Sequence, residues 1–180
     1  MFYTGVGSRE TPLDIMNLMK RMAARLESEG YVLRSGGADG ADLAFQHGLS
    51  IPSVKNAEIY LPWDGFNGQW KNTSSAFIVP EKEYAKDVTD QAERILTNAI
   101  GEAHVSRLSR GGFLCHRRNC FQVLGPDLNS PSDFLICWTS KGNAVGGTAT
   151  AIKIALQYGI PVYNLGNQDQ LREVSSWLER

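Results

Sequence analysis

The sequence predicts an α/β fold in which a mostly parallel sheet is covered by helices on both faces. Short apolar runs alternate with segments of helical periodicity along the 180 residues, a pattern typical of successive βαβ units. The run Phe134–Trp138 is continuously apolar, as expected for a strand that is buried on both faces. Turns rich in glycine follow three of the runs, at the positions where parallel sheets bind ligands.

The first half of the chain is predicted to hold three strands and two helices. We expect strands at residues 2–7, 31–35 and 57–63, and a short helix after the second strand. Thr11 is expected to cap the first helix, and Pro12 to occupy its first position. One face of that helix is apolar through Ile15, Leu18, Met19, Met22 and Leu26.

Residues 64–80 are predicted to form a long surface loop, because glycine and polar residues dominate there. This composition is compatible with a lid over a binding site and with an ordinary surface loop that has no function. The remaining expected elements are helices at 81–100, within 104–124, at 149–158 and around 171–178, and strands at 133–139 and 160–165. We find no repeat, low-complexity segment or linker, so residues 1–180 are expected to form one domain.

Composition limits the class of protein. The chain has 42% hydrophobic residues and a formal net charge of −1, which argues against disorder and against a DNA-coating protein. No run of about 18 apolar residues and no signal peptide is recognised, so no membrane partner is expected. Cys115, Cys120 and Cys137 cannot all pair within the chain, which favours a reducing, cytoplasmic location.

A local basic cluster is present in the sequence at Arg107, Arg110, Arg117 and Arg118. It fits one small polyanionic ligand better than a long nucleic-acid backbone. For Arg107 and Arg110, a solvated charged face is the favoured interpretation.

The segment Ser35–Asp42 carries the clearest chemical signal. It lies between an expected strand and an expected helix, where backbone N–H groups remain free and the helix dipole is positive. Its glycines allow the backbone to approach a ligand closely. This combination predicts a binding site for phosphate.

Two further segments, Gly5–Arg9 and Thr139–Thr148, also follow expected strands. Because the carboxyl ends of parallel strands meet at one edge of a sheet, we expect all three segments to converge there. Backbone amides near Gly36-Gly37 and near Gly146-Gly147 would then hold phosphate oxygens, with the hydroxyls of Ser8 and Thr148 as added donors.

Two charged residues in these segments each admit two roles. Arg9 can clamp a phosphate with its planar guanidinium, or it can form a surface ion pair with Glu10. Asp42 can accept hydrogen bonds from ribose hydroxyls, or it can cap the helix that begins beside it.

The segment Cys115–Cys120 contains two thiols and His116, which fall short of the four ligands of a structural zinc site. No metal is therefore expected. Arg118 and Asn119 are predicted to face the ligand cleft, with a network on the helix surface as the alternative. No serine lies in a nucleophile elbow, and catalytic residues stay unassigned.

Together these segments resemble the SLOG superfamily of Rossmann-like proteins, which includes the DprA/Smf proteins and the LOG nucleotide hydrolases. Ser35–Asp42 is similar to the family's Ser-Gly-x-Ala-x-Gly-x-Asp turn, and Arg118-Asn119 to the Arg-Asn pair of DprA-like proteins. Gly146-Gly147-Thr148 with the later Gly159-Ile160-Pro161-Val162 resembles the segment near the family's C-terminus. Gly5–Arg9 is similar to its opening strand end, and the resemblance covers about residues 5–165.

The resemblance implies a single Rossmann-like domain with strand order 3-2-1-4-5 and a nucleotide-type ligand. LOG hydrolases carry a glutamate shortly after their glycine-rich turn, whereas Thr148 is followed by Ala149-Thr150-Ala151-Ile152, so hydrolysis of that type is not expected. An acidic residue at Asp39 and the absence of a winged-helix-sized segment argue against DprA-like DNA loading. Family members often pair, so a homo-oligomer is expected, with residues 113–124 as a candidate contact.

The leading prediction is a protein that senses or sequesters a phosphorylated nucleoside or a nucleotide-derived signal, with no other cofactor. A nucleoside-phosphate N-glycosidase that uses Asp39 or Asp42 is one alternative, and DprA-like binding of single-stranded DNA is the other. The residues expected to contact the ligand are Gly7, Ser8, Arg9, Ser35, Gly36, Gly37, Asp39, Gly40, Asp42, Arg118, Asn119, Thr139, Gly146, Gly147 and Thr148.

Overall fold

The computed structural model describes residues 1–144 and 146–180. Its centre is a six-stranded sheet in the order β4-β3-β2-β1-β5-β6, in which every neighbouring pair of strands is parallel. The longest pairing joins β1 to β5, from Tyr3 opposite Phe134 to Gly7 opposite Trp138. The strands are β1 (Phe2–Gly7), β2 (Val32–Ser35), β3 (Ala57–Tyr60), β4 (Phe77–Ile78), β5 (Phe134–Trp138) and β6 (Val162–Asn164).

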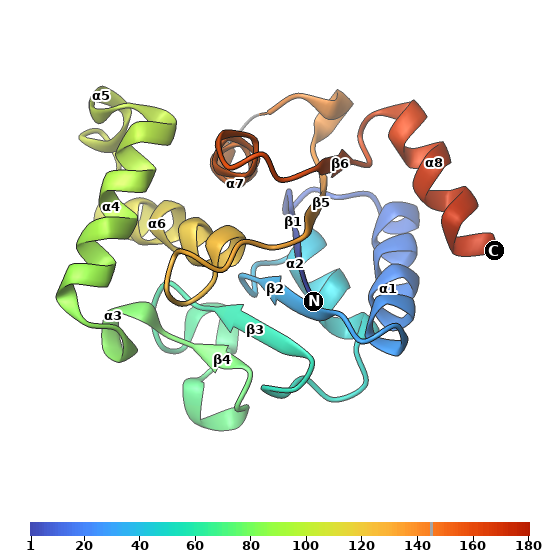
Figure 1. The fold of residues 1–180 in the computed structure, drawn as a ribbon, viewed down its shortest axis with the longest axis horizontal. Helices are drawn as coiled ribbons and strands as arrows, with labels where there is room; N and C mark the ends of the chain where they lie inside the picture. The colour runs from blue at the N-terminus through green and yellow to red at the C-terminus, as the bar shows by residue number, and fades with distance from the viewer. Residues whose placement is uncertain (145) are drawn as a thin grey trace.

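Helices cover both faces of this sheet (Figure 1). On one face lie α1 (Leu13–Ser28), α2 (Ala41–Gly48) and α8 (Gln168–Glu179). The other face is covered by α6 (Arg110–Leu124) and α7 (Gly146–Gln157), and α4 (Lys86–Ile100) packs on the outer side of these two helices. Shorter pieces are α3 (Pro80–Glu83), α5 (Glu102–Val105) and the 3₁₀ turns η1 (Phe66–Gly68), η2 (Lys71–Thr73) and η3 (Ser140–Gly142). Within the described ranges, no helix is long and apolar enough to cross a membrane.

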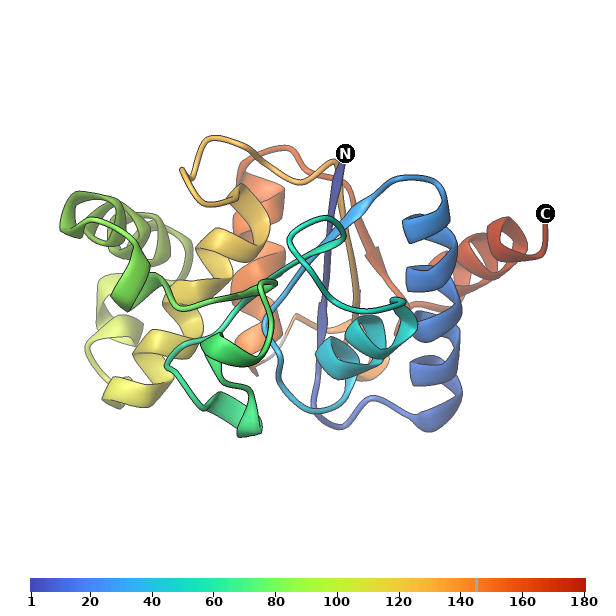
Figure 2. The ribbon, with the colours of Figure 1, turned by 90° about the horizontal axis from the view of Figure 1, so that it is seen from below.

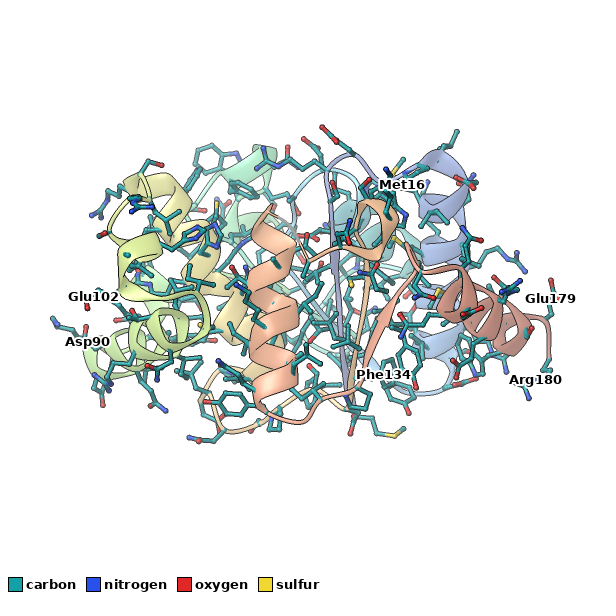
Figure 3. All side chains as sticks on the ribbon, turned by 90° about the horizontal axis from the view of Figure 1, so that it is seen from above. Met16, Asp90, Glu102, Phe134, Glu179 and Arg180 are labelled. Carbon is teal, nitrogen blue, oxygen red and sulfur yellow. The ribbon has the colours of Figure 1, made fainter. Side chains whose placement is uncertain are left out.

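Each layer of helices encloses its own apolar core. The inward face of α1 is buried because its apolar residues recur at helical spacing, at Ile15, Met19, Met22 and Leu26. The core on the opposite face includes Leu96, Phe121 and Ile154. Figure 3 shows side chains packed through both layers, with Asp90 at one end of the molecule and Arg180 at the other.

This arrangement confirms the predicted α/β class, the parallel sheet and the helices on both faces. The five predicted strands occur in the predicted order, and β4 adds a sixth strand at the edge next to β3. The third predicted strand is shorter than expected, since β3 ends at Tyr60.

The segment 64–80 is not the plain surface loop that its composition predicts. It contains η1, η2 and β4, and it buries Phe66, Ala76 and Phe77 against the core. Phe66 stands alone among polar residues and gives no periodic signal, whereas Ala76-Phe77-Ile78-Val79 is a short apolar run that the prediction of a loop overlooked.

The predicted cap of the first helix is also wrong. Pro12 precedes α1 in extended conformation, and the Thr11 hydroxyl donates a hydrogen bond to the Ser8 carbonyl oxygen at 2.7 Å. This bond ties the start of α1 to the loop after β1, so Thr11 stabilises the loop and not the helix end.

Arg34 of β2 is a buried cation that joins several strands. Its Nε donates to Glu58 Oε2 at 2.7 Å, and its Nη1 donates to the Ser130 carbonyl oxygen at 2.5 Å. The guanidinium carbon lies 3.9 Å from the centre of the Phe2 ring. The Tyr60 hydroxyl donates to the same Glu58 carboxylate at 2.8 Å. Arg34 thereby connects β1, β2, β3 and the loop before β5.

Arg34→Met is expected to lower the free energy of unfolding by about 3 kcal/mol, because the Glu58 carboxylate and the Ser130 carbonyl lose their donor. Equilibrium unfolding in urea measures this loss. Lys86→Met is the control, since its ion pair with Asp90 is exposed on α4, and less than about 1 kcal/mol should be lost there. Equal losses in the two variants would contradict the central role of Arg34.

Candidate functional site

The carboxyl ends of the central strands border a cleft of about 760 Å³. Figure 2 shows β1 running away from the N-terminus. Gly7, the last residue of β1, lines the cleft. Its walls come from the loops after β1, β2, β3 and β5, from α6 along most of its length, and from the first turns of α2 and α7. A cleft of this size is within the range of small-molecule sites.

The loop after β1 is fixed by backbone hydrogen bonds. The Ser8 N–H donates to the Trp138 carbonyl oxygen at 3.1 Å, and the Ser8 carbonyl oxygen accepts from the N–H of Ala41. The Ser8 hydroxyl accepts from the Glu10 N–H at 3.0 Å. Arg9 is exposed at the rim, and among the described residues it has no carboxylate within ion-pair distance. The guanidinium of Arg9 is therefore available to a ligand.

The first turn of α7 forms an open wall of the cleft. Gly146 and Gly147 are exposed, and a methyl group added to either residue would meet no described atom within 4 Å. The Asn119 side chain donates to the Gly147 carbonyl oxygen at 3.0 Å, which holds this turn beside α6. The N–H groups and the positive end of the helix dipole at such a turn favour an anion.

Thr139 lies at the base of the same wall and is buried. Its N–H donates to Asn164 Oδ1 at 3.1 Å, and its hydroxyl accepts from Asn164 Nδ2 at 2.6 Å. Thr139 therefore joins the loop after β5 to β6, and its hydroxyl is already engaged.

The glycine-rich turn after β2 is occupied by groups of the protein itself. The Gly36 carbonyl oxygen accepts a hydrogen bond from Arg118, and the Gly37 carbonyl oxygen accepts from Asn67 and Gln69. These side chains come from α6 and from the segment 64–80. They hold the turn in place through its carbonyl oxygens.

The backbone amides of this turn surround the carboxylate of Asp42. The Ala38 N–H donates to Asp42 Oδ2 at 3.3 Å, and the backbone N–H groups of Gly7 and Gly36 also face this carboxylate. Asp42 lies inside the first turn of α2, which is preceded by Gly40 as its N-cap residue, so the predicted capping role does not occur. An internal anion thus occupies the place predicted for the ligand.

Asp42 and Arg118 form a buried pair at the bottom of the cleft. Arg118 Nη2 lies 3.9 Å from Asp42 Oδ2, and Asp42 is only 3% exposed. Burial raises the pKa of the Asp42 carboxyl to about 6, although Arg118 and the surrounding N–H groups oppose this shift. Burial likewise lowers the pKa of Arg118. Loss of hydration therefore outweighs the attraction between the two groups.

The predicted site residues fall into two sets. Ser35, Gly36, Gly37, Asp39 and Gly40 do not line the cleft; the Ser35 hydroxyl donates to the Gly5 carbonyl oxygen, and Asp39 accepts from Asn67. The N-glycosidase alternative therefore depends on Asp42. The predicted residues that line the cleft are Gly7, Ser8, Arg9, Asp42, Arg118, Asn119, Thr139, Gly146, Gly147 and Thr148.

Sequence reasoning missed Gln122, which lines the cleft and is fully buried. Among the described residues, neither Nε2 nor Oε1 of Gln122 has a hydrogen-bond partner, and the same holds for Nε of Arg118. Gln122 follows Arg118 by four residues, so both side chains lie on one face of α6. That spacing is the signal that sequence analysis could have used.

Trp63 is a second residue that sequence reasoning did not place in the site. It follows β3, lines the cleft and is 40% exposed. Its indole packs edge to face against Phe66 with ring centres 5.1 Å apart, and it lies beside Gly111 at the start of α6. Trp63 therefore offers a supported aromatic surface at the cleft.

The basic cluster does not form one surface. Arg117 is buried in an ion pair with Glu81, and Arg118 lies inside the protein, whereas Arg107 and Arg110 are exposed as predicted. The run from Arg117 to Leu124 is buried within the chain, so this half of α6 is not available for the predicted contact between subunits.

His116 also lines the cleft, on the wall shared with α7. Its Nδ1 lies 2.7 Å from the Thr150 hydroxyl, and its ring centre is 6.0 Å from that of His104. Burial lowers the pKa of His116, which keeps the imidazole neutral near pH 7. Across residues 1–144 and 146–180, no three His, Cys, Asp or Glu side chains are grouped to hold a metal ion.

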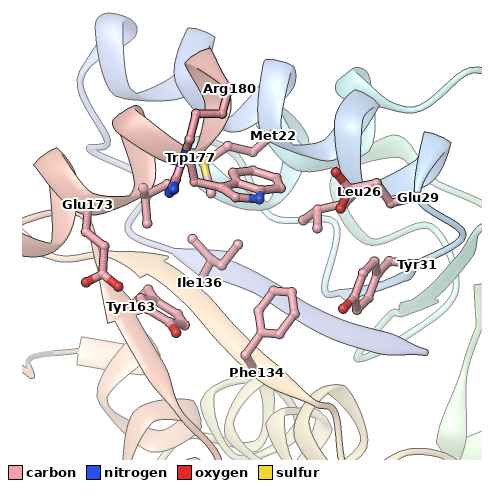
Figure 4. A pocket seen from close by; sticks show the side chains of 11 residues that line it. Met22, Leu26, Glu29, Tyr31, Phe134, Ile136, Tyr163, Glu173, Trp177 and Arg180 are labelled. Atoms are coloured by element: carbon pink, nitrogen blue, oxygen red, sulfur yellow. The ribbon is translucent and has the colours of Figure 1, made fainter.

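A second cavity, of about 270 Å³, lies between α1, α8 and the sheet. Figure 4 shows Trp177 above it, Phe134 and Ile136 below, and Tyr31 at one side. None of the predicted site residues lines this mostly apolar cavity. The cleft at the carboxyl ends is therefore the candidate site.

Comparison with known proteins bears on the fold. No protein-family profile and no curated protein sequence matches this chain. Among solved structures, the chain is similar to DNA processing protein A from Helicobacter pylori, with a TM-score of 0.55 and 16% identity. The match covers 99% of this chain and 79% of that protein, which was described for its single-stranded DNA binding mode. At this identity, the likeness supports a DprA-like fold and nothing finer.

Asp42→Asn is expected to change how stability depends on pH. Because burial raises the pKa of Asp42 to about 6 in the folded state, the unfolded chain loses this proton first. The wild-type protein should therefore lose up to about 3 kcal/mol of stability as pH rises from about 4 to about 6. The variant should lack this component in urea unfolding over the same range. Parallel curves for the two proteins would show that Asp42 is not the titrating group.

Proposed function

We propose that the cleft binds a phosphorylated nucleoside or a nucleotide-derived signal. The observation that carries this proposal is the convergence of the β1 loop, the first turn of α7 and polar side chains of α6 on one cleft. The cleft lies at the carboxyl ends of the strands, where parallel sheets bind such ligands. The agreement between a DprA-like fold and the glycine and Arg-Asn motifs also leads us to propose membership of the SLOG superfamily.

The phosphate is assigned to the side of β1 and α7. Arg9 supplies an unpaired guanidinium at the rim, and the exposed Gly146-Gly147 turn lets an anion approach backbone N–H groups closely. The turn after β2 is not assigned to phosphate, because the Asp42 carboxylate already occupies its amides.

The base is assigned to the opposite wall. Trp63 presents part of its indole there, and the ring of Phe66 packs against it at a right angle. A flat aromatic surface stacks any of the bases without selecting one of them by hydrogen bonds. The ligand would therefore lie across the strand ends, from Trp63 toward Ser8.

A second candidate function is binding of single-stranded DNA. The solved structure with the similar fold belongs to a protein described as binding single-stranded DNA. The formal net charge of −1 and the internal positions of Arg117 and Arg118 weaken this candidate, because DNA affinity depends on accessible cations.

Arg9→Gln is expected to weaken binding of a nucleoside 5′-monophosphate about tenfold, because one charged contact to the phosphate is lost. Isothermal titration calorimetry with ribonucleoside 5′-monophosphates and ADP-ribose measures this change. Arg107→Gln is the matched control; Arg107 is equally exposed but does not line the cleft, so wild-type affinity should be retained.

Two outcomes would contradict the proposal. If no nucleotide binds at a concentration of about 1 mM, nucleotides are excluded as the ligand of the cleft. Binding of single-stranded oligonucleotides alone, with affinity that rises steeply as salt is lowered, would favour the second candidate.

A further inference from the structure

The strand β6 lies at one edge of the sheet, next to β5. In a parallel ladder, alternate residues of a strand bond to one neighbour, and the residues between them point the other way. The Pro161 carbonyl oxygen and the Leu165 N–H form bonds to β5, at 2.8 and 2.7 Å. The backbone groups of Val162 and Asn164 therefore point toward the free edge of the sheet.

The side chain of Gln170 is bonded to this free edge. The Asn164 N–H donates to Gln170 Oε1 at 2.8 Å, and Gln170 Nε2 donates to the Val162 carbonyl oxygen at 3.2 Å. One residue of a further parallel strand would make the same two bonds, because its carbonyl oxygen would accept from Asn164 and its N–H would donate to Val162. The amide of Gln170 therefore takes the place of one residue of a seventh strand.

The start of α8 holds Gln170 in this position. Asn167 is the N-cap of α8, and its side chain accepts from the N–H groups of Asp169 and Gln170. The Asn167 N–H donates to the Asn164 carbonyl oxygen at 2.8 Å, which uses a further backbone group of the edge. Figure 1 shows α8 following β6 at this side of the sheet. The helix that follows the edge strand thus closes the edge.

The opposite edge of the sheet is closed by a similar contact. Val79, directly after β4, donates its N–H to Glu83 Oε1 at 2.7 Å, and the Phe77 N–H donates to the Ser74 carbonyl oxygen at 3.2 Å. Glu83 belongs to α3, the helix that follows β4. Open edges of sheets pair readily with strands of other chains, and native proteins protect them. Both edges of this sheet are protected by a side chain of the next helix.

We propose that Gln170 is a built-in block that prevents β6 from pairing with the β6 strand of a second copy of this chain. Two identical edges are self-complementary, because they pair in antiparallel orientation about a two-fold axis. Gln170 occupies the donor and the acceptor that this pairing requires. An oligomer of the wild-type chain would therefore form through another surface, and loss of the Gln170 amide would open a new one.

The first test removes the amide. Gln170→Met keeps a side chain of similar length but loses both polar atoms. We expect a species of twice the wild-type mass, whose share rises with protein concentration, in size-exclusion chromatography with light scattering. Gln168→Met is the matched control, since Gln168 is exposed in the same turn of α8, and it should keep the wild-type mass. Equal masses of Gln170→Met and wild type at every concentration would overturn the proposal.

The second test asks whether the larger species forms through β6. Val162→Pro removes an N–H that points to the free edge and leaves the bonds between β6 and β5 in place. Added to Gln170→Met, it should restore the wild-type mass. Circular dichroism and thermal unfolding check that each variant folds. A larger species that persists in the double variant would show that β6 is not the pairing surface.

The third test uses the wild-type protein alone. Because Gln170 Oε1 accepts from the Asn164 N–H, this amide should exchange with solvent deuterium more slowly than the amides of exposed loops. Hydrogen exchange followed by nuclear magnetic resonance measures the rate for this single residue. Exchange of the Asn164 amide as fast as that of an exposed loop would show that the edge is open in solution, and the proposal would be wrong.

Discussion

The buried contact between Asp42 and Arg118 organises the carboxyl edge of the sheet. Asp42 accepts from the turn after β2, and Arg118 donates to carbonyl oxygens at the ends of β2 and β3. One pair thus joins α2, α6 and two strands around the cleft. Breaking a buried pair by removing one partner costs several kcal/mol, so the shape of the cleft depends on both residues.

This contact also decides which turns remain open to a ligand. A glycine-rich turn at a helix start attracts any anion, and here the protein supplies that anion as Asp42. The equivalent turn at the start of α7 has no such internal carboxylate among the described contacts, and its glycines are exposed. The two glycine-rich turns therefore differ. The amides of the turn after β2 face the Asp42 carboxylate, whereas the turn at the start of α7 lines the cleft.

Sequence patterns predicted most of the helices and strands because periodicity is a local property, whereas the order of the strands came from the resemblance to a known family. Phe134–Trp138 is apolar throughout, and α1 repeats its apolar face every turn. In the segment 64–80, the burial of Phe66 could not be predicted because it is a single apolar residue that packs against distant parts of the chain. The strand β4 was overlooked although it lies in the apolar run Ala76–Val79. For the site, the motifs indicated the edge of the sheet at which the cleft lies. The bonds from Asn67 to Gly37 and from Arg118 to Gly36 span long stretches of sequence, and no pattern reports them.

The placement of α6 has a consequence for how a cleft of this kind diversifies. Its second half carries Arg118 and Gln122 on the same buried stretch as Phe121 and Leu124, which fill the core. A substitution at either of these polar residues therefore disturbs the packing of the core, whereas Arg9 is exposed and a methyl group added at Gly147 would meet no described atom within 4 Å. Ligand preference is therefore expected to change most readily through substitutions at the rim, where the core is not disturbed.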